Sequence, residues 1–370
     1  MSKAAELAKM GEVLTNSQIG GRRNLIINGA MQVAQRSTSA TGLGAASGYF
    51  GLDRYKIFFN TAGRLTMTQT ADGPVGFANC LKLDCTTADT SIAATENIIL
   101  SQPIEAQDLQ QLKKGTSDAE KITLSFYVKG NANAGYTVEI YDGINDRRIG
   151  QTFSVTTDWT KVILTFPADT AGALADSNAT GLFINWWLHA GSNFTGGTFD
   201  TTWADYVQNR RVGNTTSFLD STNRTFFLTG VQLEVGSVAT PFEHRSFGEE
   251  LALCQRYYVQ IGPYPSSQGA GALAIFATAD GNSGFSLIDF PVYMRAEPTL
   301  THTGTATDYN LYVANANKAG SGGFSVSSGD TLKHTLLYTE HSSTTTAGQV
   351  GTLTTASNNT DAFLGFVAEL

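Results

Sequence analysis

Residues 226–258 of this 370-residue chain read FFLTGVQLEVGSVATPFEHRSFGEELALCQRYY, a strand, a turn and a helix in that order. Over 226–235, side chains that suit a core alternate with polar ones, as expected for a half-buried strand. The side chains expected on one face of this strand are Phe227, Thr229, Val231 and Leu233. Gly236 and Pro241 then end it, because proline has no backbone donor for a sheet and biases the preceding residue away from helical angles. One β unit therefore ends here.

A short helix opens a second unit. Ser246 and Glu249 form a capping box, in which each side chain satisfies a backbone N–H of the first helical turn. The residues expected along one helical stripe are Phe247, Leu251, Cys254 and Tyr258. We therefore expect an N-terminal arm over 1–23, a main domain over 24–245 and a smaller domain over 246–370.

The composition indicates a mostly β protein. The chain has 38 glycines, 8 prolines and only 15% charged residues, a mixture typical of short strands and tight turns. Alternating apolar and polar residues recur at 122–129, 136–141, 162–166 and 181–191, with turn residues between them. This spacing predicts an antiparallel sandwich, followed by a smaller C-terminal β-sandwich-like domain.

The net charge of −8 limits the partners that the chain can have. An acidic chain repels a phosphate backbone, so we expect no binding to nucleic acid. The first residues are too polar for a signal peptide and no run of about 18 apolar residues occurs, which predicts synthesis in the cytoplasm and no membrane insertion. The three cysteines, Cys80, Cys85 and Cys254, are expected to be free thiols.

The N-terminal arm favours self-association. Residues 3–15 would form one short helix, which is marginal in water unless something packs on it. Its partner would be two further copies of the chain or a groove on a larger assembly, and a frayed tail is the alternative. We predict a homotrimer, because association would cover both the arm and the exposed sheet edges.

No sequence pattern predicts catalysis, a metal or a cofactor. Gly-x-Ser-x-Gly, P-loop and His-Glu-x-x-His motifs are absent, and the five histidines are scattered. The carboxylates considered for a glycosidase pair are Asp53, Asp142, Asp146, Asp205 and Glu234. Nothing in their spacing places two of them across a sugar bond, so we expect no enzymatic activity.

The faces opposite the predicted core carry residues suited to sugars. In GLFINWWLHAG, alternation that buries Trp186 turns Trp187 to the other face. An aromatic ring covers the apolar face of a pyranose, and amide or imidazole groups hydrogen-bond to its hydroxyls. The residues predicted to bind a glycan are Trp187, Asn185, His189, Tyr127 and Tyr141. Burial of these aromatic rings against a loop, a second subunit or the other domain is the alternative.

Two stretches of the sequence resemble proteins of tailed bacteriophages. The segments GVQLEVGSVATPFE and SFGEELALCQRYY within 226–258 resemble a region of tail-fibre and other virion structural proteins. Residues 16–55, NSQIGGRRNLIINGAMQVAQRSTSATGLGAASGYFGLDRY, are similar to the opening of the same proteins. Between them, ITLSFYVKGN (122–131) and VTTDWTKVILTFPADT (155–170) resemble jelly-roll carbohydrate-binding modules.

This resemblance implies a virion structural protein that recognises a glycan of the host surface through a jelly roll, as a tail-fibre or receptor-binding subunit does. It also implies assembly in the host cytoplasm, a trimer, and attachment to other virion proteins through the N-terminal arm. A head fibre or decoration protein of the capsid surface is one alternative, because an arm of about 23 residues is short for a fibre anchor. A polysaccharide depolymerase is the second alternative.

Overall fold

The computed structural model describes Lys3 and residues 22–213, 215–263, 271–326, 332–342, 344–356, 359 and 361–370. The helix predicted over 3–15 lies outside these residues, Lys3 excepted. The chain packs as two compact units, Met1–Glu250 with Leu370 and Leu251–Glu369. Each unit has its own hydrophobic core. The predicted domain boundaries, after residues 23 and 245, stay a prediction.

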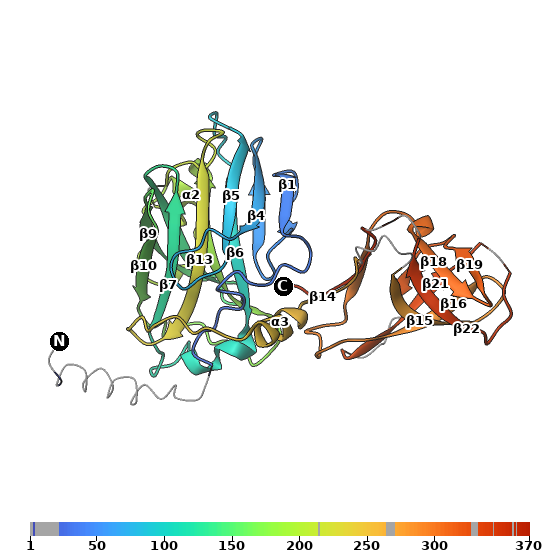
Figure 1. The fold of residues 1–370 in the computed structure, drawn as a ribbon. Coiled ribbons are helices and arrows are strands. Elements are labelled where there is room, and N and C mark those ends of the chain that lie inside the picture. The colour runs from blue at the N-terminus through green and yellow to red at the C-terminus, as the bar shows by residue number, and fades with distance from the viewer. Residues whose placement is uncertain are drawn as a thin grey trace. The chain divides into compact units, whose positions relative to one another are not determined.

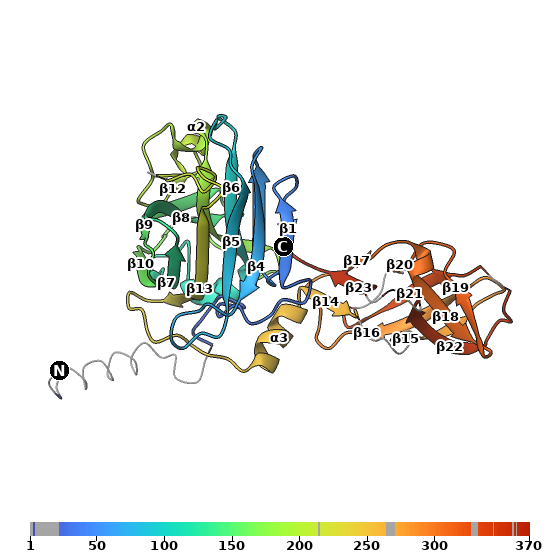
Figure 2. The ribbon, with the colours of Figure 1, turned by 45° about the horizontal axis from the view of Figure 1, so that its top comes forward.

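The first unit is a sandwich of two antiparallel sheets (Figures 1 and 2). The six-stranded sheet has the order β1-β4-β5-β13-β7-β10, and the seven-stranded sheet has the order β12-β9-β8-β11-β6-β3-β2. The prediction of a mostly β, jelly-roll-type sandwich is confirmed. The strands are β1 (Ser39–Leu43), β2 (Gly48–Tyr49), β3 (Lys56–Asn60), β4 (Arg64–Thr70), β5 (Cys80–Thr87), β6 (Asn97–Glu105), β7 (Ile122–Gly130), β8 (Ala134–Asp142), β9 (Arg147–Val155), β10 (Thr160–Phe166), β11 (Thr180–Ala190), β12 (Ala204–Asp205) and β13 (Thr225–Val235). Its short helices are η1 (Ala106–Leu112), α2 (Ser192–Thr195) and η2 (Gln208–Arg210).

The core lies between the inner faces of the two sheets. Phe126 of β7 and Trp186 of β11 are both fully buried, with ring centroids 5.8 Å apart in an edge-on arrangement. The alternation of β7, β8 and β11 predicts these inner faces correctly. The predicted core residues that are buried there are Ile122, Leu124, Phe126, Val128, Tyr136, Val138, Ile140, Leu182, Ile184, Trp186 and Leu188.

A bulge at Gly230 breaks the alternation of β13. Gly230 has φ +60°, which glycine adopts without steric cost, and the register against β7 shifts between Thr229 and Gln232. Leu228 and Leu233 both lie in the core as a result. Phe227 instead lies opposite Lys129 on the outer face. The prediction that Phe227, Thr229, Val231 and Leu233 share one face is therefore wrong.

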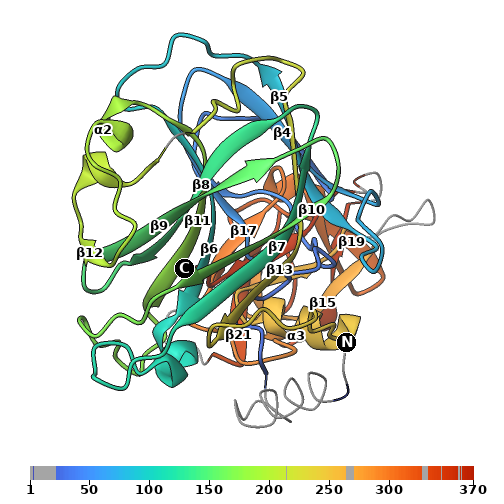
Figure 3. The same ribbon diagram turned by 90° about the vertical axis from the view of Figure 1, so that its left-hand side faces the viewer.

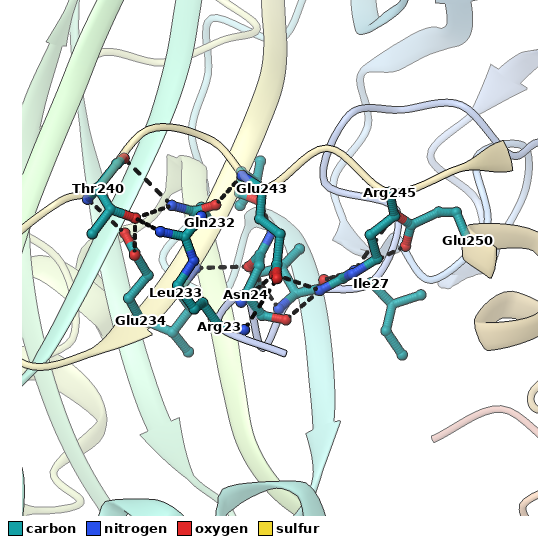
Figure 4. Close-up of polar contacts among 12 residues, drawn as sticks. Arg23, Asn24, Ile27, Gln232, Leu233, Glu234, Thr240, Glu243, Arg245 and Glu250 are labelled. Atoms are coloured by element: carbon teal, nitrogen blue, oxygen red, sulfur yellow. Dashed lines mark hydrogen bonds and ion pairs between the residues drawn. The ribbon is translucent and has the colours of Figure 1, made fainter. Parts of the chain in front are cut away.

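A buried polar network joins the start of the sandwich to its last strand (Figure 4). The side chain of Asn24 accepts the backbone N–H of Leu233 at 3.0 Å and donates to the carbonyl of Val231 at 3.0 Å. The carboxylate of Glu243 accepts the N–H of Asn24 at 2.7 Å. Together with the backbone bond from the N–H of Leu25 to the carbonyl of Leu233 at 3.0 Å, these bonds hold residues 22–28, which belong to no strand, against β13.

Arg245 extends this network to the helix α3. Its guanidinium donates to the carbonyl of Ile26 at 3.0 Å and to the carbonyl of Asn24, and it contacts the carboxylate of Glu250 at 3.2 Å (Figure 4). Glu250 in turn accepts the N–H of Asn28 at 2.6 Å. We call Asn24, Glu243, Arg245 and Glu250 the clasp. The two stretches that resemble virion proteins, 16–55 and 226–258, supply all four residues, so they share one structural role.

The helix α3 (Phe247–Gln255) begins where the capping box predicts. The hydroxyl of Ser246 accepts the N–H of Glu249 at 3.3 Å. The predicted apolar stripe fails at both ends: Phe247 is exposed, and Tyr258 lies in β14 (Tyr258–Ile261), after the helix has ended. Cys254 is buried.

The second unit consists of a three-stranded and a seven-stranded antiparallel sheet, with the orders β14-β23-β17 and β19-β18-β22-β15-β16-β21-β20. The sequence pattern predicts six strands in this part of the chain, over 257–261, 271–277, 284–290, 331–338, 349–354 and 362–367, and a strand lies at each of them. Its remaining strands are β15 (Ala272–Thr278), β16 (Ser283–Asp289), β17 (Thr299–His302), β18 (Tyr309–Val313), β19 (Ala316–Ala319), β20 (Ser325–Val326), β21 (His334–Glu340), β22 (Val350–Thr355) and β23 (Leu364–Val367), with η3 (Ala306–Asp308) before β18. Sequence patterns missed β17 to β20, which have two to five residues each.

Among the described residues, no helix is long and apolar enough to span a bilayer. None of the three cysteines forms a disulfide bond, as predicted, and all three are buried. Burial raises the pKa of Cys80 to about 11, so this thiol is unreactive at neutral pH.

Candidate functional site

The structure divides the five predicted site residues between the two sheets of the first unit. Asn185, Trp187 and His189 lie on β11 and Tyr141 lies on β8, all on the outer face of the seven-stranded sheet. Tyr127 lies on β7, on the outer face of the six-stranded sheet. The five side chains therefore do not form one surface.

Three of these side chains are buried, although the sequence predicts them to be exposed. The exposed fractions of Asn185, Trp187 and His189 are 4%, 0% and 0%. Residues 191–213 run along this face (Figure 3), and the ring of Phe194 lies 5.1 Å from that of Trp187. Alternation predicts correctly that Trp187 points away from the core, but it does not predict the segment that covers the ring. The expectation of an exposed Trp187–Asn185–His189 surface is wrong.

Trp187 supports a buried ion pair. Its indole N–H donates to Glu139 Oε2 at 3.1 Å, and Asn185 Nδ2 donates to the same oxygen at 3.1 Å. Arg211 binds both oxygens of Glu139, at 2.8 and 2.6 Å, and its guanidinium lies 4.7 Å from the centre of the Trp187 ring. Burial by itself lowers the pKa of Arg211, but the charge of Glu139 outweighs it and raises that pKa. These contacts give Trp187 and Asn185 a structural role.

Tyr141 is half-buried at the border of this covered region. Its ring stacks on Phe183 at 5.8 Å and contacts Tyr206 at 5.8 Å. Its hydroxyl donates to Asp146 at 2.6 Å, and burial raises its pKa. Tyr141 is thus held by neighbours within the unit.

His189 is a further polar side chain on this covered face. Its Nδ1 lies 2.8 Å from Ser217 Oγ, and its Nε2 lies 3.6 Å from a carboxylate oxygen of Glu96. Burial lowers the pKa of His189, although the charge of Glu96 opposes this effect.

We expect acid to destabilise the first unit through His189. Because its pKa in the folded protein lies below the ordinary value of about 6.5, the unfolded chain binds the proton more tightly. The full stability is present above about pH 6.5 and is lost as the pH falls from there through the lower pKa that His189 has in the folded protein. Urea unfolding at pH 7.5 and pH 5.5 should show a smaller pH dependence for His189→Gln than for the wild type. Equal pH dependence in both proteins would exclude His189 as the cause.

An open aromatic surface lies on the other sheet, whose strands β10, β7, β13, β5 and β4 run side by side in Figure 1. Phe77 is central, with ring centroids 5.4 Å from Tyr127 and 5.0 Å from Phe242. Trp159 and Phe227 form a second pair at 6.1 Å. Phe227 is buried and the other four are half-buried. We call these five residues the aromatic row.

Charged groups flank the aromatic row. Lys129 lies 4.6 Å from the centre of the Phe227 ring and 5.3 Å from that of Trp159, and it pairs with Asp72 at 2.6 Å. The Trp159 indole N–H donates to the carbonyl of Asp72 at 3.1 Å. Lys161 is exposed and lies 5.9 Å from the centre of the Tyr127 ring. Ring faces and charged groups therefore share one open surface.

Sequence reasoning finds only Tyr127 of the aromatic row. Trp159 lies directly before β10, in the segment VTTDWT that resembles carbohydrate-binding modules. This resemblance is the sequence feature from which Trp159 could have been identified as a candidate site residue. Phe77 and Phe242 lie in irregular segments, where alternation gives no orientation. Alternation predicts that Phe227 shares a face with Val231 and Leu233, but the bulge at Gly230 puts Phe227 on the opposite side of the strand from them.

The carboxylates considered for a glycosidase pair have partners within the sandwich. Asp142 pairs with buried Lys114 at 2.5 Å, and Asp205 pairs with Arg147 at 2.8 Å. Within the described ranges, no three His, Cys, Asp or Glu side chains are grouped as a metal ion would require.

Comparison with known proteins gives a likeness in fold. No family model and no curated protein matches the chain. Similar solved structures are carbohydrate-binding modules, which are β-sandwiches. A structure described as "CBM4 structure and function" is 14% identical and aligns with 56% of this chain and 97% of its own, with a TM-score of 0.29. The CBM22-1 xylan-binding domain from Paenibacillus barcinonensis is 13% identical over 60% of this chain and 100% of its own, with a TM-score of 0.29.

A third similar structure is the family 11 carbohydrate-binding module from Clostridium thermocellum in complex with a β-1,3-1,4-mixed-linked tetrasaccharide. It is 10% identical over 53% of this chain and 100% of its own, with a TM-score of 0.29. All three likenesses are weak and concern the fold alone.

Proposed function

We propose that the first unit binds a glycan through the aromatic row and that the chain is a non-enzymatic structural protein of a bacteriophage virion. The observation that carries the glycan proposal is the row itself, because four half-buried rings lie on one sheet face beside charged side chains. Half-buried rings are held in place by their neighbours while part of each ring remains available to a ligand.

The chemistry of this surface suits a sugar. The apolar C–H face of a pyranose packs on an aromatic ring, and the Lys161 ammonium and the Asp72 carboxylate are placed to hydrogen-bond to hydroxyls. One such site binds in the millimolar to micromolar range, on the order of −4 to −8 kcal/mol. Several copies on one particle raise the overall affinity by roughly 10² to 10⁴.

The virion assignment is supported by the resemblance of residues 16–55 and 226–258, which the clasp joins in the folded chain. The proposed place is a tail fibre or receptor-binding subunit, as a homotrimer, with the host surface glycan as ligand and other virion proteins bound through the N-terminal arm. Labelling virions with an antibody to the second unit and imaging them tests this place. Label on the tail supports the proposal, and label on the head makes the chain a head fibre or decoration protein instead.

Trp159→Ala and Tyr127→Ala are each expected to weaken binding to host cells or to capsule glycan at least tenfold. Because both rings are half-buried, the melting temperature should change little. Trp203→Ala is the matched control, since Trp203 is also half-buried and lies by Lys114, outside the aromatic row. Unchanged binding by both row variants would rule the row out as the glycan site, and shortening of the glycan by the wild type would indicate a depolymerase.

A further inference from the structure

The outer face of the seven-stranded sheet in the second unit is apolar and exposed. Ile275, Leu287 and Val350 are 73%, 61% and 69% exposed, values unusual for aliphatic side chains on strands. The other exposed large side chains on this face are Tyr312, Phe285 and Leu336. They lie on five adjacent strands, β18, β22, β15, β16 and β21.

The register arranges these side chains in two rows across the sheet. Cross-strand pairs place Tyr312 and Ile275 on either side of Thr352, and Leu287 beside Leu336. The second row contains Val350, Ala277, Phe285 and Tyr338, with the last two rings 5.5 Å apart. Neither row contains a charged residue. We call the nine residues of these two rows the apolar face.

The size of this surface matches a contact between two proteins. Strands are about 4.8 Å apart and alternate residues are about 6.8 Å apart, so the two rows cover roughly 300 Å² and the whole seven-stranded face roughly 700 Å². The two rows form an uncharged patch of roughly 300 Å², and a patch of this size on a monomer often marks an interaction site. A stable interface buries about 800 Å² on each partner, so the full face supplies nearly the area needed, with the apolar rows at its centre.

Charge favours another copy of this chain as the occupant. Residues 251–370 contain four Lys or Arg and eight Asp or Glu, a net charge of 4 − 8 = −4. Two copies that met through their acidic surfaces would repel each other. Contact through the apolar face avoids placing like charges opposite each other. A cationic partner would find no carboxylate in the two rows. The carboxylates on the same face, Asp289 and Glu340, lie outside the two rows. Two sheet faces with apolar centres also pack well, since apolar side chains interdigitate between sheets about 10 Å apart.

We propose that the apolar face is the surface through which copies of this chain associate. This inference rests on the self-association proposed above and assigns its interface. Packing by this face explains why six large apolar side chains of the second unit lie on its surface, where a monomer would leave them in water.

Light scattering of the full chain after size-exclusion chromatography tests this interface. We expect the wild type to be a dimer or trimer at about 10 μM, and Leu287→Asp and Ile275→Asp to be monomers. Both positions are exposed in a single copy, so neither aspartate is buried within the fold. Tyr293→Asp is the control, because Tyr293 is 66% exposed in the same unit but lies outside the strands of this face. It should leave the assembly intact.

The outcomes separate the inference from the proposals on which it rests. A monomeric wild type overturns both self-association and the assigned interface. An oligomeric wild type with oligomeric Leu287→Asp and Ile275→Asp overturns the interface alone. If aspartate unfolds the unit, as far-ultraviolet circular dichroism would show, Leu287→Thr is the second variant. Threonine is β-branched and suits a strand, and its smaller, more polar side chain should still weaken association at least tenfold. Binding of glycan by single subunits should be unchanged in every monomeric variant.

Discussion

Replacing Arg245 with leucine is expected to lower the free energy of unfolding of the first unit by roughly 3–5 kcal/mol. The change leaves the carbonyls of Asn24 and Ile26 without their donor. It also leaves the buried carboxylate of Glu250 without its cation. Leucine replaces the volume of the side chain in part but none of its five donors.

Tryptophan fluorescence during urea unfolding of the full chain reports this loss. The four tryptophans, Trp159, Trp186, Trp187 and Trp203, all belong to the first unit. Arg210→Leu is the control, since Arg210 is exposed on η2 and its replacement should change stability by about 0.5 kcal/mol or less. A loss below about 1 kcal/mol for Arg245→Leu would show that the clasp contributes little to the fold.

The sequence predicts the β architecture well because alternation is a local property of each strand. The inner faces of β7, β8 and β11 and six strands of the second unit follow from it. It fails at Gly230, where one bulge reverses the side of every later residue in β13. The clasp was also beyond local reasoning, since Asn24 bonds to Leu233, which lies 209 positions further along the chain.

The candidate site was harder to predict because exposure depends on segments without regular patterns. Trp187 points away from the core as predicted, yet residues 191–213 cover it. The aromatic row shows the opposite case, a surface that the sequence pattern predicts only in part. Tyr127 is predicted from its strand, but Phe77 and Phe242 come from loops that only the folded chain brings together. Residue type therefore suggests a sugar surface, and the tertiary structure places the proposed surface on the six-stranded sheet.

Trp187→Ala is expected to destabilise the first unit by roughly 3–5 kcal/mol, the usual cost of truncating a buried aromatic. The ring is fully buried, and its loss leaves a cavity beside Phe194 and removes the surface on which Arg211 lies. Glu139 would also lose the indole N–H as a donor. Urea unfolding followed by far-ultraviolet circular dichroism measures the effect without depending on the fluorophore that the change removes.

Two further substitutions separate the contributions at this position. Trp187→Phe keeps an aromatic face for Arg211 but not the N–H bonded to Glu139. The stability of the first unit in this variant should therefore fall between those of the wild type and Trp187→Ala. Trp159→Ala, at a half-buried position on the aromatic row, should cost less than Trp187→Ala and instead weaken glycan binding. If Trp187→Ala kept the wild-type stability and lost glycan binding, the covering segment would have to open in solution. The ligand surface would then be on the seven-stranded sheet, where the sequence pattern first placed it.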